Sequence, residues 1–177
     1  MVKRVLAAVC AALCLFAFNG CEAHHAIKLP QLKALEKELR ETIPTIEDMY
    51  NVYGYAIGLD IDIACGDVTR EEALTIARKV RELFIQEEFQ DELFAAMDGQ
   101  SREDYLENHP PPPTVSVFIH GNSYPRMPQE WPTYFFWADF YADRDMSGKG
   151  YIYDGYSTWH GKHKGEEIDM EEILEAE

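Results

Sequence analysis

The sequence predicts an α+β domain, in which a four-stranded, mostly antiparallel sheet carries one main helix packed on one face. Three observations lead to this prediction. One segment alternates strictly between apolar and small or acidic residues, one amphipathic segment begins with a helix cap, and three β-rich segments follow it without another helix between them. The expected order is strand, helix, strand, strand, strand, preceded by a short amphipathic helix.

The alternating segment spans residues 53–65. Its odd positions up to Ile63 are tyrosine, isoleucine or leucine, whereas its even positions are glycine, alanine or aspartate. Because successive side chains of a strand point to opposite faces, we expect one strand with one buried face. The small residues of its first half would form a shallow trough on the other face, with Asp60 and Asp62 at one end.

Two segments have helical spacing. Four apolar residues recur every three to four positions within residues 29–43, and Pro44 follows, so a short N-terminal helix is expected there. Thr69 and Glu72 have the spacing of a capping box, which places the start of the main helix. Residues 87–97 either prolong the main helix or form a second one, and the sequence leaves both open.

The last three strands are expected over residues 114–121, 133–142 and 150–160, which are rich in aromatic and β-branched residues. A proline-rich loop precedes the first of them, and a second loop with three prolines separates the first from the second. We expect both loops to lie outside the sheet, since proline cannot donate to a ladder.

The middle one of these strands has large aromatic side chains at both parities, and a single helix layer covers only one face. Phe135, Trp137 and Tyr141 share one side. We therefore expect an exposed patch of these three residues beside Asp60 and Asp62, anchored by Trp137, because aromatic clusters rimmed by charge are typical of contacts with a partner or a sugar. The alternative is that the rings only shield the bare backbone of strand glycines.

The charge balance excludes one class of function. The chain has 16 basic against 32 acidic side chains and a formal net charge of -16. Such a surface repels a phosphate backbone, so we expect no binding to nucleic acid. The acidity favours solubility, or else a basic partner.

The N-terminus has the pattern of an export signal. A basic start, MVKR, precedes a short apolar run that ends at FNGC, residues 18–21. This ending resembles the lipobox of bacterial lipoproteins, and the resemblance implies that Cys21 is acylated and anchors the protein in the cell membrane. Cleavage after Ala23, which would give a secreted protein, is the competing interpretation.

The sequence thus predicts an export signal over residues 1–20, possibly to 23, a linker with a short helix over 21–48, the α+β domain over 50–163, and an acidic tail over 164–177.

The segment DRDMSGKGYIYD, residues 143–154, resembles the loop of a helix-loop-helix calcium site. Asp143, Asp145, Ser147 and Asp154 stand at its ligand positions one, three, five and twelve, and glycine stands at position six. Both flanks have strand composition, so the same residues also fit the tip of a β-hairpin. Both interpretations stay open. The resemblance implies at most weak calcium binding, and no other cofactor is expected.

No known catalytic or phosphate-binding motif accompanies the histidines and carboxylates of the chain. The leading interpretation is therefore an exported envelope protein, membrane-bound through the acyl chains on Cys21, whose domain binds an unknown protein or small ligand without catalysis. A secreted, hydrolase-like enzyme that uses His120 or His160 with strand carboxylates is the alternative. A further alternative is an acidic inhibitor or immunity-type protein that neutralises a basic target.

Overall fold

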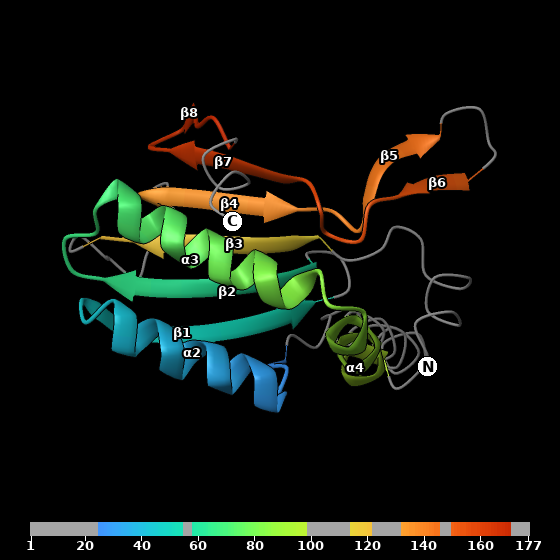
Figure 1. Cartoon of the computed structure of the whole chain (residues 1–177), viewed down its shortest axis with the longest axis horizontal. Helices are drawn as coiled ribbons and strands as arrows, with labels where there is room; N and C mark the ends of the chain where they lie inside the picture. Colours follow the sequence, from blue (N-terminus) through green and yellow to red (C-terminus); the bar gives the residue numbers. More distant parts are fainter. Residues whose placement is uncertain (1–24, 55–57, 99–113, 122–131, 146–149, 171–177) are drawn as a thin grey trace, which may run out of the picture.

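A computed structural model of the 177-residue chain describes residues 25–54, 58–98, 114–121, 132–145 and 150–170. These residues form three helices, a six-stranded sheet and a two-stranded sheet (Figure 1). The predicted α+β class is confirmed. The finer expectation was wrong, because the main sheet has six strands rather than four and contains a parallel pair, and two helices rather than one lie over it.

The six strands lie in the order β1-β2-β3-β4-β7-β8. Their bounds are Ile46–Gly54 (β1), Gly58–Cys65 (β2), Val115–His120 (β3), Tyr134–Ala138 (β4), Trp159–His163 (β7) and Glu166–Glu167 (β8). β2 and β3 are parallel, and every other neighbouring pair is antiparallel. A parallel pair needs a long crossover connection, and the segment with α3 (Arg70–Phe84) and α4 (Glu87–Asp98) provides it.

The alternating segment 53–65 belongs to two strands, not to the single strand that the sequence predicts. β1 and β2 pair antiparallel, with Tyr53 directly opposite Leu59. The alternation is misleading because residues opposite each other in a hairpin point to the same face, so the period of two continues in phase across the turn. Gly58 has a φ of +81°, and a Cβ there would collide with the backbone of Thr114, so the position requires glycine.

The outer edge of β1 is covered at one end by the segment that precedes α2 (Pro30–Thr42). The backbone N–H of His25 donates to the carbonyl of Tyr53 at 3.0 Å, and the N–H of Tyr53 donates back to His25 at 2.8 Å. Next to this bridge, the N–H of Ile27 donates to Oδ1 of Asn51 at 2.8 Å. These contacts occupy part of an edge that would otherwise invite pairing with another strand.

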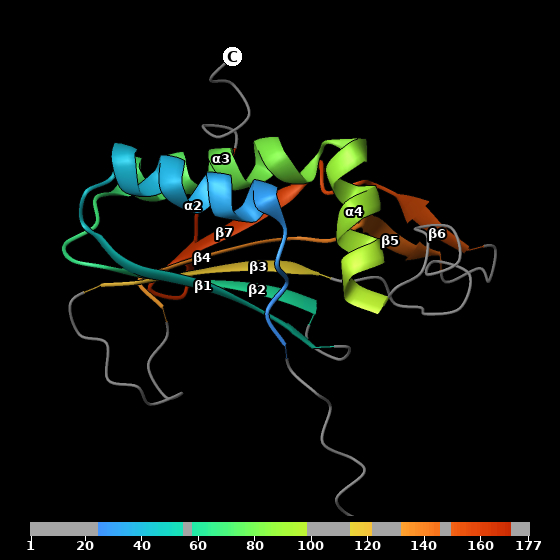
Figure 2. The same cartoon turned by 90° about the horizontal axis from the view of Figure 1, so that it is seen from below.

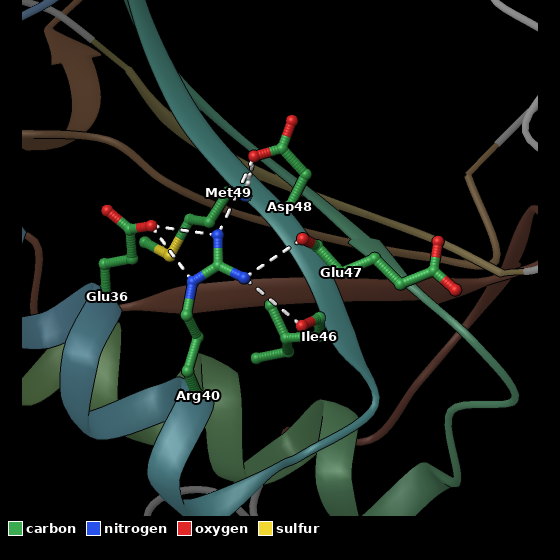
Figure 3. Close-up of polar contacts among 6 residues, drawn as sticks. All are labelled: Glu36, Arg40, Ile46, Glu47, Asp48 and Met49. Atoms are coloured by element: carbon green, nitrogen blue, oxygen red, sulfur yellow. Dashed lines mark hydrogen bonds and ion pairs between the residues drawn. The ribbon is translucent and has the colours of Figure 1, made fainter.

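The other end of this edge is covered by Arg40 of α2 (Figure 3). Its guanidinium donates to the carbonyls of Ile46 at 3.2 Å and Glu47 at 3.1 Å. It also binds the Glu36 carboxylate at 2.9 and 3.0 Å and lies 3.7 Å from Asp48. The register of β1 against β2 shifts between Ile46 and Asp48, so Arg40 satisfies carbonyls at this bulge.

α2 and α3 lie next to each other over one face of the large sheet (Figure 2). α2 is the short amphipathic helix that the sequence predicts, and its three buried leucines make it a layer of the domain. Lys79 of α3 contacts Glu38 of α2 at 3.1 Å across the helix pair. The core between helices and sheet includes Leu35, Leu39, Ile61, Ile63, Ile76, Val80, Val117, Ile119 and Phe136, all buried.

α3 begins at the predicted capping box. The hydroxyl of Thr69 accepts from the N–H of Glu72 at 3.2 Å, and the N–H of Thr69 donates to the Glu72 carboxylate at 2.8 Å. Residues 87–97 form a second helix, α4, rather than an extension of α3. Buried Gln90 holds the junction, because its Nε2 donates to the carbonyls of Phe84 and Gly155 at 2.7 and 3.1 Å.

Two further expected strands, 133–142 and 150–160, are each broken in two as well. β4 ends at Ala138, and the chain continues as β5 (Tyr141–Asp145), which pairs with β6 (Gly150–Tyr153) in a separate sheet. β6 is separated from β7 by a turn in which Gly155 and Tyr156 have φ values of 60° and 61°. Such positive dihedrals interrupt an extended chain, so β7 starts afresh in the large sheet.

The expected acidic tail begins as part of the domain. Residues 166–167 are strand β8, which pairs with β7, and residues 171–177 lie outside the described part. Beyond β8, Met170 reaches the covered face of the sheet, where a Cβ at Gly161 would lie 2.6 Å from its Sδ and 2.9 Å from a ring carbon of Phe136. Gly161 therefore leaves room for both side chains.

Candidate binding face of the sheet

The face of the large sheet opposite α2 and α3, which we call the open face, has no described helix over it (Figure 2). The strand register arranges its side chains in two rows, each of which crosses the strands in the order β1, β2, β3, β4, β7. Row A is Val52, Asp60, Ser116, Trp137 and His160, and row B is Tyr50, Asp62, Phe118, Phe135 and Lys162. Each row thus has a carboxylate on β2, aromatic rings on β3 or β4, and a basic side chain on β7.

Four rings form a continuous ladder across the centre of the open face. Phe118 and Phe135 have centroids 4.8 Å apart, Phe135 and Trp137 4.9 Å, and Trp137 and His160 5.1 Å, with interplanar angles of 22°, 17° and 22°. Rings at these separations and angles are offset-stacked and partly cover each other's faces. The ladder therefore stabilises the sheet by cross-strand packing and also presents a band of ring edges.

The two sides of the ladder carry opposite charge. On the β2 side, Asp60 and Asp62 are half-buried. On the β7 side, the Lys162 ammonium lies 5.7 Å from the centroid of the Trp137 ring, close enough for a cation–π contact, and His160 is exposed. The open face is thus polarised across its strands, from acidic at β2 to basic at β7.

Most of the predicted patch is brought together, in a geometry that the sequence did not specify. Trp137, Phe135, Asp60 and Asp62 share the open face, whereas the backbone of Tyr141 belongs to β5 in the other sheet. Of the small residues expected to form a trough, Gly58 at the hairpin end abuts the Thr114 backbone, and Ala56 lies outside the described residues.

Sequence reasoning missed five residues of the open face: Tyr50, Val52, Ser116, Phe118 and Lys162. Phe118 and Ser116 stand at alternate positions of a strand whose other positions are aliphatic, and this alternation was the signal that could have found them. Lys162 gave no such signal in the sequence, because it follows a glycine in a segment that resembles a loop.

The two histidines of the enzyme hypothesis lie on different strands with different partners. His120 Nε2 lies 3.4 Å from Oδ1 of Asp62, with 19% and 20% of the two side chains exposed, and the donor depends on the histidine tautomer. His160 instead stacks on Trp137. Ser116 is four residues before His120 on β3, so its hydroxyl is two pleats away from the imidazole. Among the described residues, the contact with Asp62 gives an oriented imidazole, and the Ser116 hydroxyl of the same strand does not reach it.

The candidate calcium loop has strands on both sides rather than helices. β5 and β6 pair antiparallel, with Asp143 opposite Ile152 and Asp145 opposite Gly150, while Ser147 lies outside the described residues. The Asp154 carboxylate accepts from the N–H and the hydroxyl of Thr158 at 2.8 and 2.9 Å, so it caps the turn before β7. Within the described ranges, no three metal-ligating side chains cluster. Calcium binding stays a prediction.

Cys65 lies at the end of β2 on the covered face and is 2% exposed. Burial raises the pKa of its thiol to about 11, and the carboxylates of Glu72 and Glu47 add to this shift. A thiol with this pKa is protonated at neutral pH and is a poor nucleophile. Cys65 therefore acts as a small apolar residue of the core.

No protein-family model, curated protein or solved structure matches the chain. Cys21 and the export signal lie outside the described residues, and in the part that is described no helix is long and apolar enough to cross a membrane. The open face is thus the feature on which a functional proposal has to rest.

Proposed function

We propose that this chain is an exported, lipid-anchored envelope protein whose α+β domain binds a partner or ligand on its open face without catalysing a reaction. One observation carries the proposal. The ring ladder around Trp137 lies on a sheet face without a described helix over it, and charged side chains flank it on both sides. Aromatic residues rimmed by polar groups are typical of protein interfaces and ligand sites.

Anchoring at Cys21 would keep the domain close to the membrane. His25 is already hydrogen-bonded to β1, so the folded part begins four positions after the acylated cysteine, with three residues between the two. A fully extended chain of four residues spans at most about 14 Å. The open face would then act near the membrane surface rather than at the end of a long tether.

The binding proposal is tested by capture from an envelope extract of the source organism with Trp137→Ala. We expect the variant to lose the captured ligand while its circular-dichroism melt stays close to that of the wild type, because the ring belongs to the half-buried side of β4. Ile85→Ala is the matched control, since Ile85 is also an exposed apolar residue but lies beyond α3. Equal capture by both variants would contradict the proposal.

The anchor is tested by Cys21→Ser. We expect the protein to move from membranes to soluble fractions, because stable attachment needs the acyl chains. Cys65→Ala, which changes a buried cysteine, should leave the protein in the membrane fraction. A Cys21→Ser protein that stays membrane-bound would show that another contact holds it there.

The contact between His120 and Asp62 favours one second candidate, a hydrolase-like activity with His120 as general base. Wild type and His120→Asn should then differ in the hydrolysis of a panel of p-nitrophenyl esters and glycosides. Indistinguishable rates would contradict the hydrolase-like activity, and binding would then be the one function proposed.

A further inference from the structure

The two rows of the open face are self-complementary. Across row A, Asp60 on β2 matches His160 on β7 in distance from the centre, and across row B Asp62 matches Lys162. The boundary between β3 and β4 lies midway between these strands. A two-fold axis can be placed over this boundary, between two copies that face each other and parallel to their strands. It puts β2 opposite the second copy's β7 and β3 opposite its β4, and each residue then faces a residue of the same row.

We propose that the open face binds a second copy of this chain about that axis. The proposal rests on the proposed function, because it names the occupant of the same face. In such a dimer, each acidic residue of β2 faces a basic residue of the partner's β7, so Asp62 meets Lys162 and Asp60 meets His160. Such reciprocal contacts define an isologous interface.

The centre of the face has matching shapes. In row A the large Trp137 on β4 stands next to the small, 7% exposed Ser116 on β3. The axis places each Trp137 ring over the partner's Ser116, so a large side chain meets a small one. In row B it places Phe135 over Phe118 of the other copy. Sheets pack face to face in this way with their strands within about 30° of each other.

Other occupants fit these charges less well. A strongly basic partner would meet Lys162 and His160 on the β7 side, and a nucleic acid would meet the net charge of -16. A strand added beside β1 would meet an edge that Arg40 and the segment from His25 already occupy. A second copy carries both charges in the required order.

The test is sedimentation velocity of the purified protein at about 0.15 M salt, over concentrations from about 1 μM to about 100 μM. We expect a concentration-dependent dimer, and Trp137→Ala should raise its dissociation constant at least about 30-fold as a central aromatic contact. Ile85→Ala, remote from the face, should leave the constant unchanged.

Charge reversal provides a readout that misfolding cannot imitate. Lys162→Asp and Asp62→Lys should each be monomeric, because each homodimer would then place like charges opposite each other twice. A one-to-one mixture of the two variants should dimerise, since both of its pairs unite opposite charges. Recovery in the mixture supports the inference even if the single variants are less stable.

Three results would overturn it: a wild type that stays monomeric throughout, a dimer that survives Trp137→Ala, or a mixture that fails to associate. A monomer that still captures an envelope ligand through Trp137 would overturn the dimer alone. A wild type that neither forms a dimer nor captures an envelope ligand would overturn the binding function as well.

Discussion

The two faces of the large sheet are built from the same strands and differ in what lies over them. On β4, Tyr134, Phe136 and Ala138 point to the helices and are buried, whereas Phe135 and Trp137 point the other way and are half-buried. Both sets are rich in aromatic rings, so hydrophobicity does not separate them. The layer above each face decides whether a ring contributes mainly to stability or is available for binding.

The sharpest test of this difference uses two neighbouring phenylalanines. Phe136 is fully buried, so Phe136→Ala should lower the free energy of unfolding by about 3 to 5 kcal/mol. Phe135→Ala should cost about 1 to 1.5 kcal/mol, because part of that ring is already in water. Denaturant unfolding of both variants measures the two values. Equal losses would mean that the open face is packed as tightly as the covered one.

A thiol reports the same difference through pH. Cys65 on the covered face has a pKa near 11, above its ordinary value of 9.0, so the unfolded chain releases this proton first. The contribution of this protonated thiol to the free energy of unfolding is complete below about pH 9. It is lost as pH rises through about 11, and the loss amounts to roughly 2 to 3 kcal/mol. Unfolding curves in reducing buffer between these pH values measure the loss.

The control moves the thiol to the other face. Cys65→Ala combined with Ala64→Cys places it at the adjacent, half-buried position of β2, where the alkaline loss should be much smaller. A residual slope above pH 10 is expected in both proteins, because burial also raises the pKa of Tyr134. A full alkaline loss in the double variant would assign the effect to groups other than Cys65.

The covered face also depends on how α3 begins. Thr69→Ala removes the side-chain acceptor of the capping box and should cost about 1 kcal/mol. Thr75→Ala, in the same helix, should be neutral or slightly stabilising, because alanine has the higher helix propensity. The hydrogen bonds from the Thr69 N–H and hydroxyl lower the pKa of Glu72, so the stabilisation that they give to the ionised carboxylate is present above about pH 4.5 and fades in acid. The bond from the Glu72 N–H to the Thr69 hydroxyl oxygen does not depend on this ionisation, so the Thr69→Ala loss should shrink in acid without vanishing. A loss that is the same at all pH values would contradict the contribution of the carboxylate.

The helices were predictable because their signals are local. The Thr69 cap and the leucine spacing of α2 depend on residues within a few turns of each other. The strand boundaries were not predictable from the sequence. Residues of a hairpin stay in phase across its turn, so the alternation of residues 53–65 does not show where one strand ends and the next begins. β1 itself was missed because the polar Asn51 occupies a position facing the helices and the bulge after Ile46 shifts the phase.

The candidate site was predictable in part for the same reason. Alternation within one strand placed Trp137 and Phe135 together on one face. Their neighbours Phe118, Lys162 and His160 come from other strands, and only the register brings them into rows. The contact of Asp62 with His120 joins residues 58 positions apart, across a parallel pair that the sequence does not mark.

The smallest expected effect concerns that contact. With 20% of Asp62 and 19% of His120 exposed and 3.4 Å between the two atoms, the pair should contribute no more than about 1 kcal/mol of coupling. A double-mutant cycle with Asp62→Asn and His120→Asn measures this coupling directly from the free energies of unfolding. A small value means that Asp62 is held only loosely by its own chain and is available to the partner's Lys162. A coupling well above this value would make the pair part of the fold, and the acidic side of the open face would then be as structural as the covered one.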